Sequence, residues 1–323
     1  MIILSDKQIQ QVLTPDLAVR AIEMVFEQEG KGKTVLPTRL NFPVNHGWFR
    51  TMPGAIMTGD QSGIMGCKIM NLHKDRGLYY LILLYDQETG QPVALMDAAA
   101  ITAMRTGAVS AVAARRILDE DVEELGLVGT GFEAKGQLTA FASALPLKKV
   151  KVFSRKAENR DEFAREMSAS LGIDIEPVDD GAKAVSGQRL VVLATKSSVP
   201  VIDGDWLEAG STVVSISVIN RELDRKAMQR AAWIVVDHKE QVMNESADIK
   251  IALSEGILDE ERFVEIAQVH GSMPSVAGKD VLIFKSTGTA LQDLAVAHQV
   301  YLTCKQQGIG TSIEDFPYLK IFK

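Results

Sequence analysis

The sequence predicts an α/β protein in which a doubly wound parallel sheet is joined to a second, α+β domain. Three observations support this fold class. The length of 323 residues suits two domains. From residue 125 onward, short apolar runs alternate with helical stretches, as in a parallel sheet covered by helices. The first third instead carries one amphipathic helix and several apolar runs separated by turn residues, as in an antiparallel or mixed sheet.

The first third begins with a well-marked helix. Residues 14–16 (TPD) place a capping residue before a proline at the first helical position, and apolar residues recur at helical spacing up to Gly30. The uninterrupted apolar character of 78–85 predicts a buried strand. The alanine-rich segment 98–118 predicts a helix that is broken or bent near Gly107. Strands are expected at 36–42, 48–52, 66–70, 78–85 and 92–96.

An acidic hexamer at 119–124 separates this part from the alternating part of the chain. The last helical stretch, 289–307, either ends the second domain or returns to pack on the first third. We therefore expect one domain of residues 1–118 plus 290–323 and another of residues 119–289. Strands are expected at 125–128, 150–153, 173–178, 190–194, 212–216 and 233–236, with helices at 133–145 and 158–171.

Charge and composition exclude several classes of protein. The 35 Lys and Arg against 42 Asp and Glu give a net charge of −7, which argues against nucleic acid or an anionic membrane surface as partner. The longest apolar run is far shorter than the about 20 residues of a spanning helix. Two cysteines, Cys67 and Cys304, are too few for a disulfide framework. With a polar N-terminus unlike a signal peptide, this predicts a cytoplasmic protein. The five histidines show no metal-ligand spacing, so no metal site is expected.

The strongest chemical signal is a glycine loop at 129–134, with the sequence GTGFEA, between a predicted strand and a predicted helix. Its first glycine permits a tight turn, its second lets the backbone approach a pyrophosphate, and the alanine lets the helix pack on the strand. In this context the loop predicts a Rossmann-type dinucleotide site; the alternative is a Rossmann-like domain without ligand. The expected contacts are Gly129, Thr130, Gly131 and Ala134.

The choice of dinucleotide is decided at the end of the second strand, where NAD enzymes usually carry a carboxylate on the ribose. Here Ser154, Arg155 and Lys156 follow Phe153. These side chains suit a ribose phosphate, so NADPH is favoured over NADH. NADH stays open, because the two cations also suit a solvated turn.

Further motifs are 37–39 (PTR), 51–53 (TMP), 66–68 (GCK), 102–106 (TAMRT) and 284–293 (FKSTGTALQD). With the glycine loop they resemble the ornithine cyclodeaminase and mu-crystallin family over essentially the whole chain. The resemblance implies a homodimer, with the N-terminal part and the C-terminal helix forming a substrate-binding and dimerisation domain.

The resemblance also implies roles for single residues. Arg39, Lys68 and Arg105 hold the carboxylate of an amino or imino acid, with Lys68 and Arg105 as catalytic residues. Lys68 supplies a proton if burial among cations lowers its pKa; the alternative is an ordinary lysine beside a strand. Asp293 either caps or orients this pocket, or it is an ordinary aspartate on a helix surface or in a buried pair. The residues expected near the dinucleotide are Thr106, Gly129, Gly131, Thr195, Ser286 and Gly288, joined by Ser154, Arg155, Lys156 and Asn159 from a string similar to NADPH-binding mu-crystallin.

Two departures from the ornithine cyclodeaminases concern the reaction. Those enzymes carry a base glutamate two positions before the Met-Pro pair, where this chain has Arg50, which is no base at neutral pH. They also carry an aspartate on the loop after the fifth strand, whereas residues 215–222 contain none, and Asp224 beyond them is not expected to replace it. Both departures argue against ornithine cyclisation.

The leading hypothesis is an NAD(P)H-dependent oxidoreductase that interconverts an imino acid and an amino acid, with a cyclic ketimine such as pyrroline-2-carboxylate or piperideine-2-carboxylate as substrate. Alanine-dehydrogenase-like reductive amination is the nearest variant. Two other hypotheses are an ornithine cyclodeaminase that uses NAD catalytically, and a non-enzymatic binder of NADPH and a small ligand.

Overall fold

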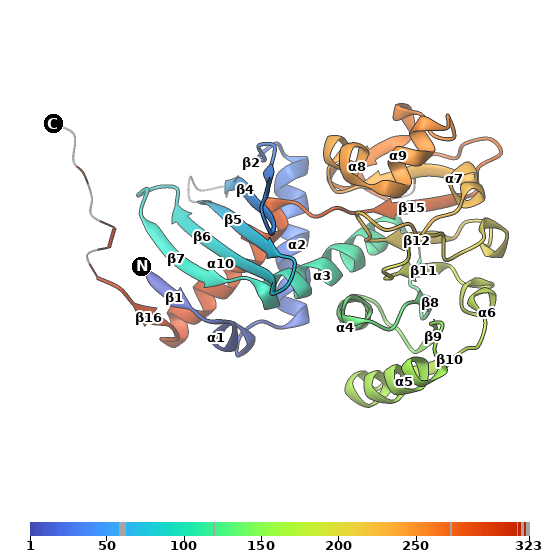
Figure 1. Ribbon diagram of the computed structural model, residues 1–323, viewed down its shortest axis with the longest axis horizontal. Helices are drawn as coiled ribbons and strands as arrows, with labels where there is room; N and C mark the ends of the chain where they lie inside the picture. Colours follow the sequence, from blue (N-terminus) through green and yellow to red (C-terminus); the bar gives the residue numbers. More distant parts are fainter. Residues whose placement is uncertain (58–62, 119, 272, 315, 318–319, 321–323) are drawn as a thin grey trace. The chain divides into compact units, whose positions relative to one another are not determined.

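The computed structural model describes residues 1–57, 63–118, 120–271, 273–314, 316–317 and 320. The chain divides into two compact units, Met1–Arg105 with Thr289–Lys323 and Thr106–Gly288 (Figure 1). Each unit contains a sheet of eight strands among the described residues. The sheet of the second unit is parallel throughout, and the predicted α/β fold class is confirmed.

The division lies within helix α3 (Ala99–Ile117), not after it as the predicted boundary at 118 implies. The helix is also continuous, so of the two predicted alternatives near Gly107, a break or a bend, the break is wrong. A Cβ atom at Gly107 would overlap the carbonyl oxygen of Gly136, and it would lie 2.9 Å from the Cβ of Ala140. The glycine thus serves close helix packing that ties the later turns of α3 to the second unit. The roles predicted for the two domains stay predictions.

The first unit is built on a mixed sheet in the order β16-β1-β7-β6-β5-β4-β2, with β3 paired to β4. Its pairs are antiparallel except for β1 with β7. All five strands predicted here are present, with shifted ends. The strands are β1 (Ile2–Leu4), β2 (Thr34–Val35), β3 (Leu40–Val44), β4 (Gly47–Met57), β5 (Gly63–His73), β6 (Gly77–Asp86), β7 (Pro92–Asp97) and β16 (Thr311–Ser312).

Three helices belong to this sheet: α1 (Asp6–Gln10), α2 (Pro15–Gly30) and α10 (Ala290–Gln307). The hydroxyl of Thr14 accepts a hydrogen bond from the amide of Leu17, so the predicted cap of α2 is confirmed. Helix α10 contacts α2, β4, β5 and β6. The last helix therefore returns to the first unit, which was one of the two alternatives.

The two faces of this sheet differ in burial. The cross-strand neighbours Lys68, Ile82 and Met96 share the face on which α10 packs, and all three are buried. The opposite face exposes Tyr79 and Leu81 of β6, at 67% and 43%. The prediction that 78–85 is a buried strand is therefore wrong, because an antiparallel sheet places alternate residues on opposite faces and only one face is covered within this chain.

The second unit has the strand order β10-β9-β8-β11-β12-β15-β13-β14. The chain runs from β8 outward to β10 and then crosses to β11, so the order reverses between β8 and β11. Two strands were not predicted, β14 and β15, and β15 lies inside the sheet between β12 and β13. The strands are β8 (Glu124–Val128), β9 (Lys149–Phe153), β10 (Asp174–Pro177), β11 (Leu190–Leu193), β12 (Thr212–Ser215), β13 (Ala231–Val236), β14 (Phe263–Glu265) and β15 (Val281–Lys285).

The helices of this unit are α4 (Phe132–Ala144), α5 (Ala157–Leu171), α6 (Gly181–Val185), α7 (Arg225–Arg230), α8 (Lys239–Glu245) and α9 (Ala247–Ser254). The core on one side of the sheet joins apolar residues of β11, β12, β13 and β15 to residues of α7, α8 and α9. Among the described residues, no helix is both long and apolar enough to cross a membrane.

Candidate functional site

The carboxyl ends of six strands in the second unit lie in one row. Neighbours along this row pair with each other in the register of the sheet. The residues that follow the row therefore share the edge at which open α/β sheets bind ligands. Its members, in sheet order, are Phe153, Val128, Leu193, Ser215, Lys285 and Val236.

The glycine loop follows β8 at the point where the strand order reverses. Gly129 has φ +118°, and a Cβ there would overlap the carbonyl oxygen of Ala194, so a side chain is excluded. Gly131 precedes α4 and has open space where a side chain would be, while Ala134 is fully buried. Thr130, between the two glycines, is half-buried. The loop thus combines a tight turn with an open helix N-terminus, which fits a dinucleotide pyrophosphate.

The residues after β9 form a separate exposed group. Arg155, Lys156 and Asn159 are exposed, and Ser154 is half-buried. The carbonyl oxygen of Ser154 accepts a hydrogen bond of 2.7 Å from the guanidinium of Arg160, a residue that the sequence analysis did not single out. This turn therefore presents two cations at the end of the second strand.

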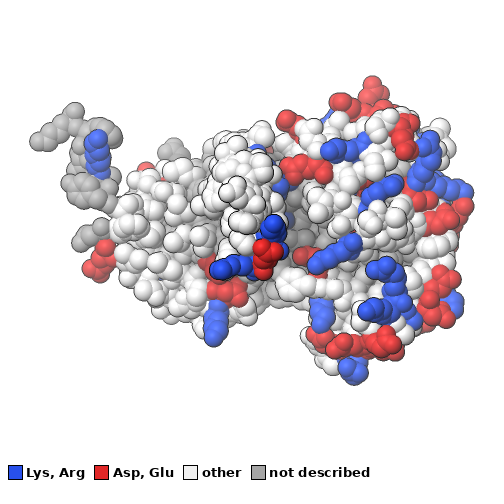
Figure 2. Space-filling view, viewed as in Figure 1, with Lys and Arg blue, Asp and Glu red and all other residues white. Residues whose placement is uncertain are grey.

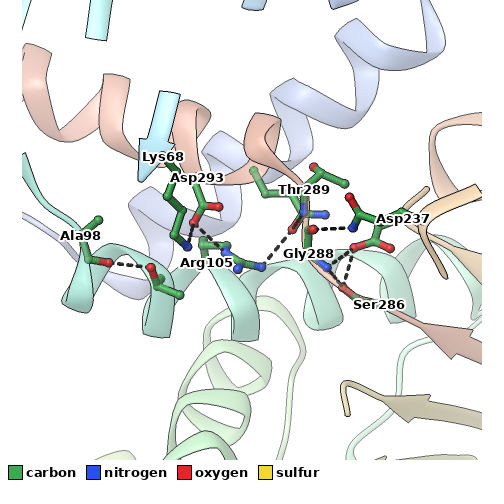
Figure 3. A network of polar contacts seen from close by, with 11 residues as sticks. Lys68, Ala98, Arg105, Asp237, Ser286, Gly288, Thr289 and Asp293 are labelled. Carbon is green, nitrogen blue, oxygen red and sulfur yellow. Dashed lines mark hydrogen bonds and ion pairs between the residues drawn. The ribbon is translucent and has the colours of Figure 1, made fainter. Parts of the chain in front are cut away.

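Ser286 and Gly288 lie in a turn held by a buried aspartate (Figure 3). The hydroxyl of Ser286 and the amide of Gly288 each donate a hydrogen bond of 2.7 Å to Oδ2 of Asp237. The side-chain amide of Gln241 donates to the carbonyl oxygen of Gly288 at 2.7 Å. Because the proton of Ser286 is used by Asp237, this hydroxyl offers a ligand only its lone pairs.

Cations gather on the covered face of the mixed sheet in the first unit. The ammonium of Lys68 lies 2.8 Å from Oδ1 of Asp293, and Nε of Arg105 lies 2.9 Å from the same oxygen (Figure 3). A further nitrogen of Arg105 donates to Gln292 at 3.1 Å. Side chains of Lys68, Arg105 and Asp293 are 1%, 9% and 0% exposed. Of the two alternatives for Asp293, the buried pair is present, and it also orients both cations.

Burial lowers the pKa of one member of this cluster. The pKa of Lys68 is lowered to about 8, chiefly by burial; Asp293 raises it, while Arg105 and Arg39 lower it. Arg39 is half-buried and acts on Lys68 electrostatically. Two buried cations, Lys68 and Arg105, thus share one carboxylate, and this excess of positive charge suits an anionic ligand. Thr106 follows Arg105 on α3 and is half-buried.

The structure shows the surroundings of the two places at which the sequence departs from the ornithine cyclodeaminases, Arg50 and the loop before Asp224. Arg50 lies on β4 with its guanidinium 5.1 Å from the centre of the Trp48 ring. Asp224 caps α7: its carboxylate accepts hydrogen bonds from the amides of Ala227 and Gly204, at 2.9 and 3.1 Å. Asp224 therefore has a structural role in the loop region where cyclodeaminases were expected to carry an aspartate.

Two other groups were not anticipated. The ligand atoms of His46, His73 and Asp75 come within 4.8 Å of one another, because paired hairpins bring distant residues together. Nδ1 of His73 already accepts a hydrogen bond from the amide of Asp75, and the absence of a metal site stays a prediction. The second group is a buried polar network in the second unit that contains Glu222 and Lys285.

The family profile of "Ornithine cyclodeaminase/mu-crystallin family" matches residues 1–308. The chain belongs to this family. The alanine dehydrogenase of Archaeoglobus fulgidus is 29% identical over 332 aligned positions, which cover 98% of each protein. This family membership confirms the predicted resemblance.

Solved structures of the family agree with the fold over nearly the whole chain. The Delta(1)-pyrroline-2-carboxylate reductase of Thermococcus litoralis, in complex with NADH and L-proline, is 30% identical, with a TM-score of 0.86 over 97% of this chain and all of that one. An archaeal alanine dehydrogenase dimer with bound NAD is 28% identical, with a TM-score of 0.87 over 98% and 99% of the two chains.

Proposed function

We propose that the protein is an NAD(P)H-dependent oxidoreductase that interconverts an imino acid and an amino acid, with a cyclic ketimine such as pyrroline-2-carboxylate or piperideine-2-carboxylate as the preferred substrate. The observation that carries this proposal is the buried cluster of Lys68 and Arg105 on Asp293, with Arg39 beside it. A desolvated excess of cations favours a small carboxylate. The pyrroline-2-carboxylate reductase bound to NADH and proline supports the same substrate class.

Each residue of the cluster has a distinct role in this proposal. Arg105 offers a planar fork to the substrate carboxylate, and Arg39 adds a second cation. Lys68, with a pKa of about 8, is the proton donor to the imine nitrogen, because this pKa is close to neutral pH. The bound dinucleotide supplies the hydride. Holding the carboxylate fixes the orientation of the imine carbon.

The dinucleotide is held, in this proposal, by the glycine loop and by the residues that follow the row of strand ends. NADPH is preferred because the exposed Arg155 and Lys156 suit a ribose phosphate. The relatives with NADH or NAD bound support the dinucleotide site itself, and NADH is the alternative. The contacts proposed are Thr106, Gly129, Thr130, Gly131, Ala134, Ser154, Arg155, Lys156, Asn159, Thr195, Ser286 and Gly288.

Reductive amination of a keto acid is the second candidate, because the similarity to alanine dehydrogenases extends over the whole chain. Ornithine cyclisation is disfavoured by Arg50, whose guanidinium cannot act as a base. A non-enzymatic binder is disfavoured by a buried lysine whose pKa lies close to neutrality.

We further propose a homodimer formed through the uncovered face of the mixed sheet. Among the described residues, seven large apolar side chains are exposed on this face, and over this unit Figure 2 shows few charged side chains. The archaeal alanine dehydrogenase dimer supports the same assembly. A cytoplasmic location is proposed because both cysteines are unbridged. The seven residues are Val35, Leu40, Phe42, Val44, Met65, Tyr79 and Leu81.

The decisive experiment follows the absorbance of the reduced nicotinamide. NADPH and NADH are tested in parallel against cyclic ketimines and against keto acids with ammonia. Rapid oxidation with a cyclic ketimine is expected. Oxidation only with a keto acid and ammonia favours the alanine-dehydrogenase reaction instead. Ammonia release from ornithine without net oxidation of the dinucleotide contradicts the proposed reductase.

A further inference from the structure

A buried polar network lies at the carboxyl ends of β11, β12 and β15, and none of the roles above uses its charged members. It joins Thr195, Ser215, Glu222, Asp248 and Lys285. All except Thr195 are at most 3% exposed. Buried charges are unfavourable unless fixed partners compensate them. Each charged group of this network therefore needs a hydrogen-bond partner, and the donor and the acceptor of each bond can be assigned.

The direction of each hydrogen bond follows from Lys285. Its ammonium, which can only donate, lies 2.6 Å from the hydroxyl of Ser215 and 3.1 Å from Oδ2 of Asp248. Because Ser215 accepts from Lys285, its own proton goes to Oε2 of Glu222, at 2.7 Å. Both oxygens of Asp248 accept from the amide of Glu222, at 3.2 Å. Backbone and side chain of Glu222 are thus fixed together.

The other carboxylate oxygen of Glu222 binds both the backbone and the side chain of Thr195. Oε1 accepts from the amide of Thr195 at 2.7 Å and from its hydroxyl at 3.0 Å. A hydroxyl has one proton, so the side chain of Thr195 has only lone pairs left to offer. The amide of Ser197 donates to this hydroxyl at the long distance of 3.4 Å. Glu222 therefore makes the Thr195 hydroxyl an acceptor for other groups.

Thr195 borders the glycine loop. Its methyl carbon lies 3.4 Å from the position of a Cβ on Gly129, and the preceding carbonyl, that of Ala194, occupies the space next to this glycine. The amide of Ala194 donates to the carbonyl oxygen of Val128, the last residue of β8. A ligand held by the loop therefore lies beside the turn that Glu222 holds.

We propose that Glu222 is a positioning residue for dinucleotide binding. Through its two hydrogen bonds to Thr195 it presents the threonine hydroxyl as an acceptor to a donor group of the dinucleotide, a ribose hydroxyl or the carboxamide NH₂, and not to a phosphate oxygen. Lys285, Ser215 and Asp248 fix the Glu222 carboxylate. This inference rests on the proposed function, because it takes a dinucleotide as the ligand.

A double-mutant cycle on NADH binding tests the proposal in the full-length protein. Glu222→Gln is expected to raise the Kd for NADH about tenfold, because the two hydrogen bonds from Thr195 lose their charged acceptor. In the Thr195→Val background the same change has no further effect, since Glu222 acts through Thr195. Thr195→Ser restores the wild-type Kd. A purely structural role of Glu222 weakens binding equally in both backgrounds.

Two further variants separate an effect on NADH binding from an effect on folding. Ser215→Ala removes one donor to Glu222 and adds no charge, so it keeps the test open if Glu222→Gln does not fold; its expected effect on the Kd is about threefold. Asp280→Asn removes the ion pair with Arg230, elsewhere in the same unit, and one of the two hydrogen bonds of 2.9 Å that Arg230 donates to this carboxylate. This control is expected to lower the Tm without changing the Kd for NADH.

The reduced 3-acetylpyridine analogue, which lacks the carboxamide NH₂, separates the two donors. If its Kd is insensitive to Thr195→Val, the donor is the carboxamide; if it is as sensitive as that of NADH, the donor is a ribose hydroxyl. Additive losses in the cycle, or a Kd unchanged in both Glu222→Gln and Ser215→Ala, overturn the inference. The two proposals fail separately. If the double-mutant cycle shows coupling between Glu222 and Thr195 but the protein oxidises NADH with no substrate of the panel, the proposed function is wrong and the inference on Glu222 still holds.

Discussion

The Lys68 ammonium and the Asp293 carboxylate form an ion pair of 2.8 Å, with side chains 1% and 0% exposed. The same carboxylate oxygen accepts from Arg105, so one aspartate serves two cations. The other oxygen of Asp293, Oδ2, is buried and has no hydrogen-bond partner among the described residues. Oδ2 can therefore accept from a donor group of a ligand. The two cations exceed this single carboxylate by one positive charge, and since buried charges are stable only when compensated, they favour the arrival of one more anionic group. A substrate carboxylate meets that requirement.

Asp293→Asn is expected to move the pH dependence of the reaction. Asp293 raises the pKa of Lys68, so its removal lowers this pKa below about 8. If protonated Lys68 is the acid, kcat/KM falls as the pH rises through its pKa, and this limb shifts to lower pH in the variant. Profiles of kcat/KM between about pH 6 and 9 check this. Asp16→Asn, at an exposed carboxylate, is the control, and an unshifted limb in Asp293→Asn contradicts the role of Lys68.

Lys68 is also expected to make stability depend on pH. Its pKa falls from 10.5 in the unfolded chain to about 8 in the folded protein, chiefly because of burial. Between these values the unfolded chain binds a proton that the native protein lacks, so the free energy of unfolding rises with pH, by at most about 1.4 kcal/mol per pH unit. Lys68→Met removes this rise. Urea unfolding at several pH values measures it, with Lys31→Met as an exposed control; equal slopes in all three proteins refute the prediction.

Arg105→Ala is expected to raise the KM for the imino acid about 100-fold, because a charged fork to the carboxylate is lost. The Kd for the dinucleotide stays within about twofold, since the partners of this guanidinium, Asp293 and Gln292, belong to the first unit. Arg105→Lys keeps a point charge without the fork and gives an intermediate KM. Steady-state kinetics and a binding titration measure both quantities. An unchanged KM in Arg105→Ala refutes the assignment of this residue.

Much of the fold is predictable because its signals are local. The cap at Thr14, the alternation of the second unit and the glycine loop each depend on neighbouring residues. Strand β15 was missed because its five residues follow a long segment without regular pattern, and its place between β12 and β13 is determined by long-range pairing. Burial of 78–85 was predicted wrongly because a continuous apolar run does not reveal whether one face of a strand remains uncovered.

In the candidate site, too, residues in local motifs were predictable and residues brought together by long-range strand pairing were not. Lys68 and Arg105 were selected through motifs, and the structure brings both to Asp293. Glu222 and Lys285 were given no role. Lys285 lies inside the motif 284–293, but neither the motif nor the loop before Glu222 reveals that the two charges belong to one buried network. Ser215 links the two residues, and the parallel register of β12 and β15 places Ser215 beside Lys285. Pairings of this kind become visible only when the order of the strands is known.

The uncovered face of the mixed sheet is expected to be the dimer interface. Leu81→Lys places a charge among apolar residues and converts a dimer into a monomer of 35.2 kDa. Leu302→Lys is a matched control, because Leu302 on α10 is 42% exposed against 43% for Leu81. Light scattering after size-exclusion chromatography gives the masses. A dimer that survives Leu81→Lys, or dissociates equally in Leu302→Lys, contradicts this interface.

Arg155→Asp is expected to change the preference between the two dinucleotides. Arg155 is exposed in the turn after β9. In NAD enzymes a carboxylate at this place binds the ribose hydroxyls, and it would repel a ribose phosphate. The variant therefore binds NADPH more weakly, about tenfold or more, while its affinity for NADH is kept or improved. Arg165→Asp makes the same charge change at an exposed position farther along α5 and separates a local contact from the general field of the protein. Titrations with both dinucleotides measure the ratio of the two Kd values. If this ratio stays constant in Arg155→Asp, or moves equally in Arg165→Asp, the turn after the second strand does not select the phosphate.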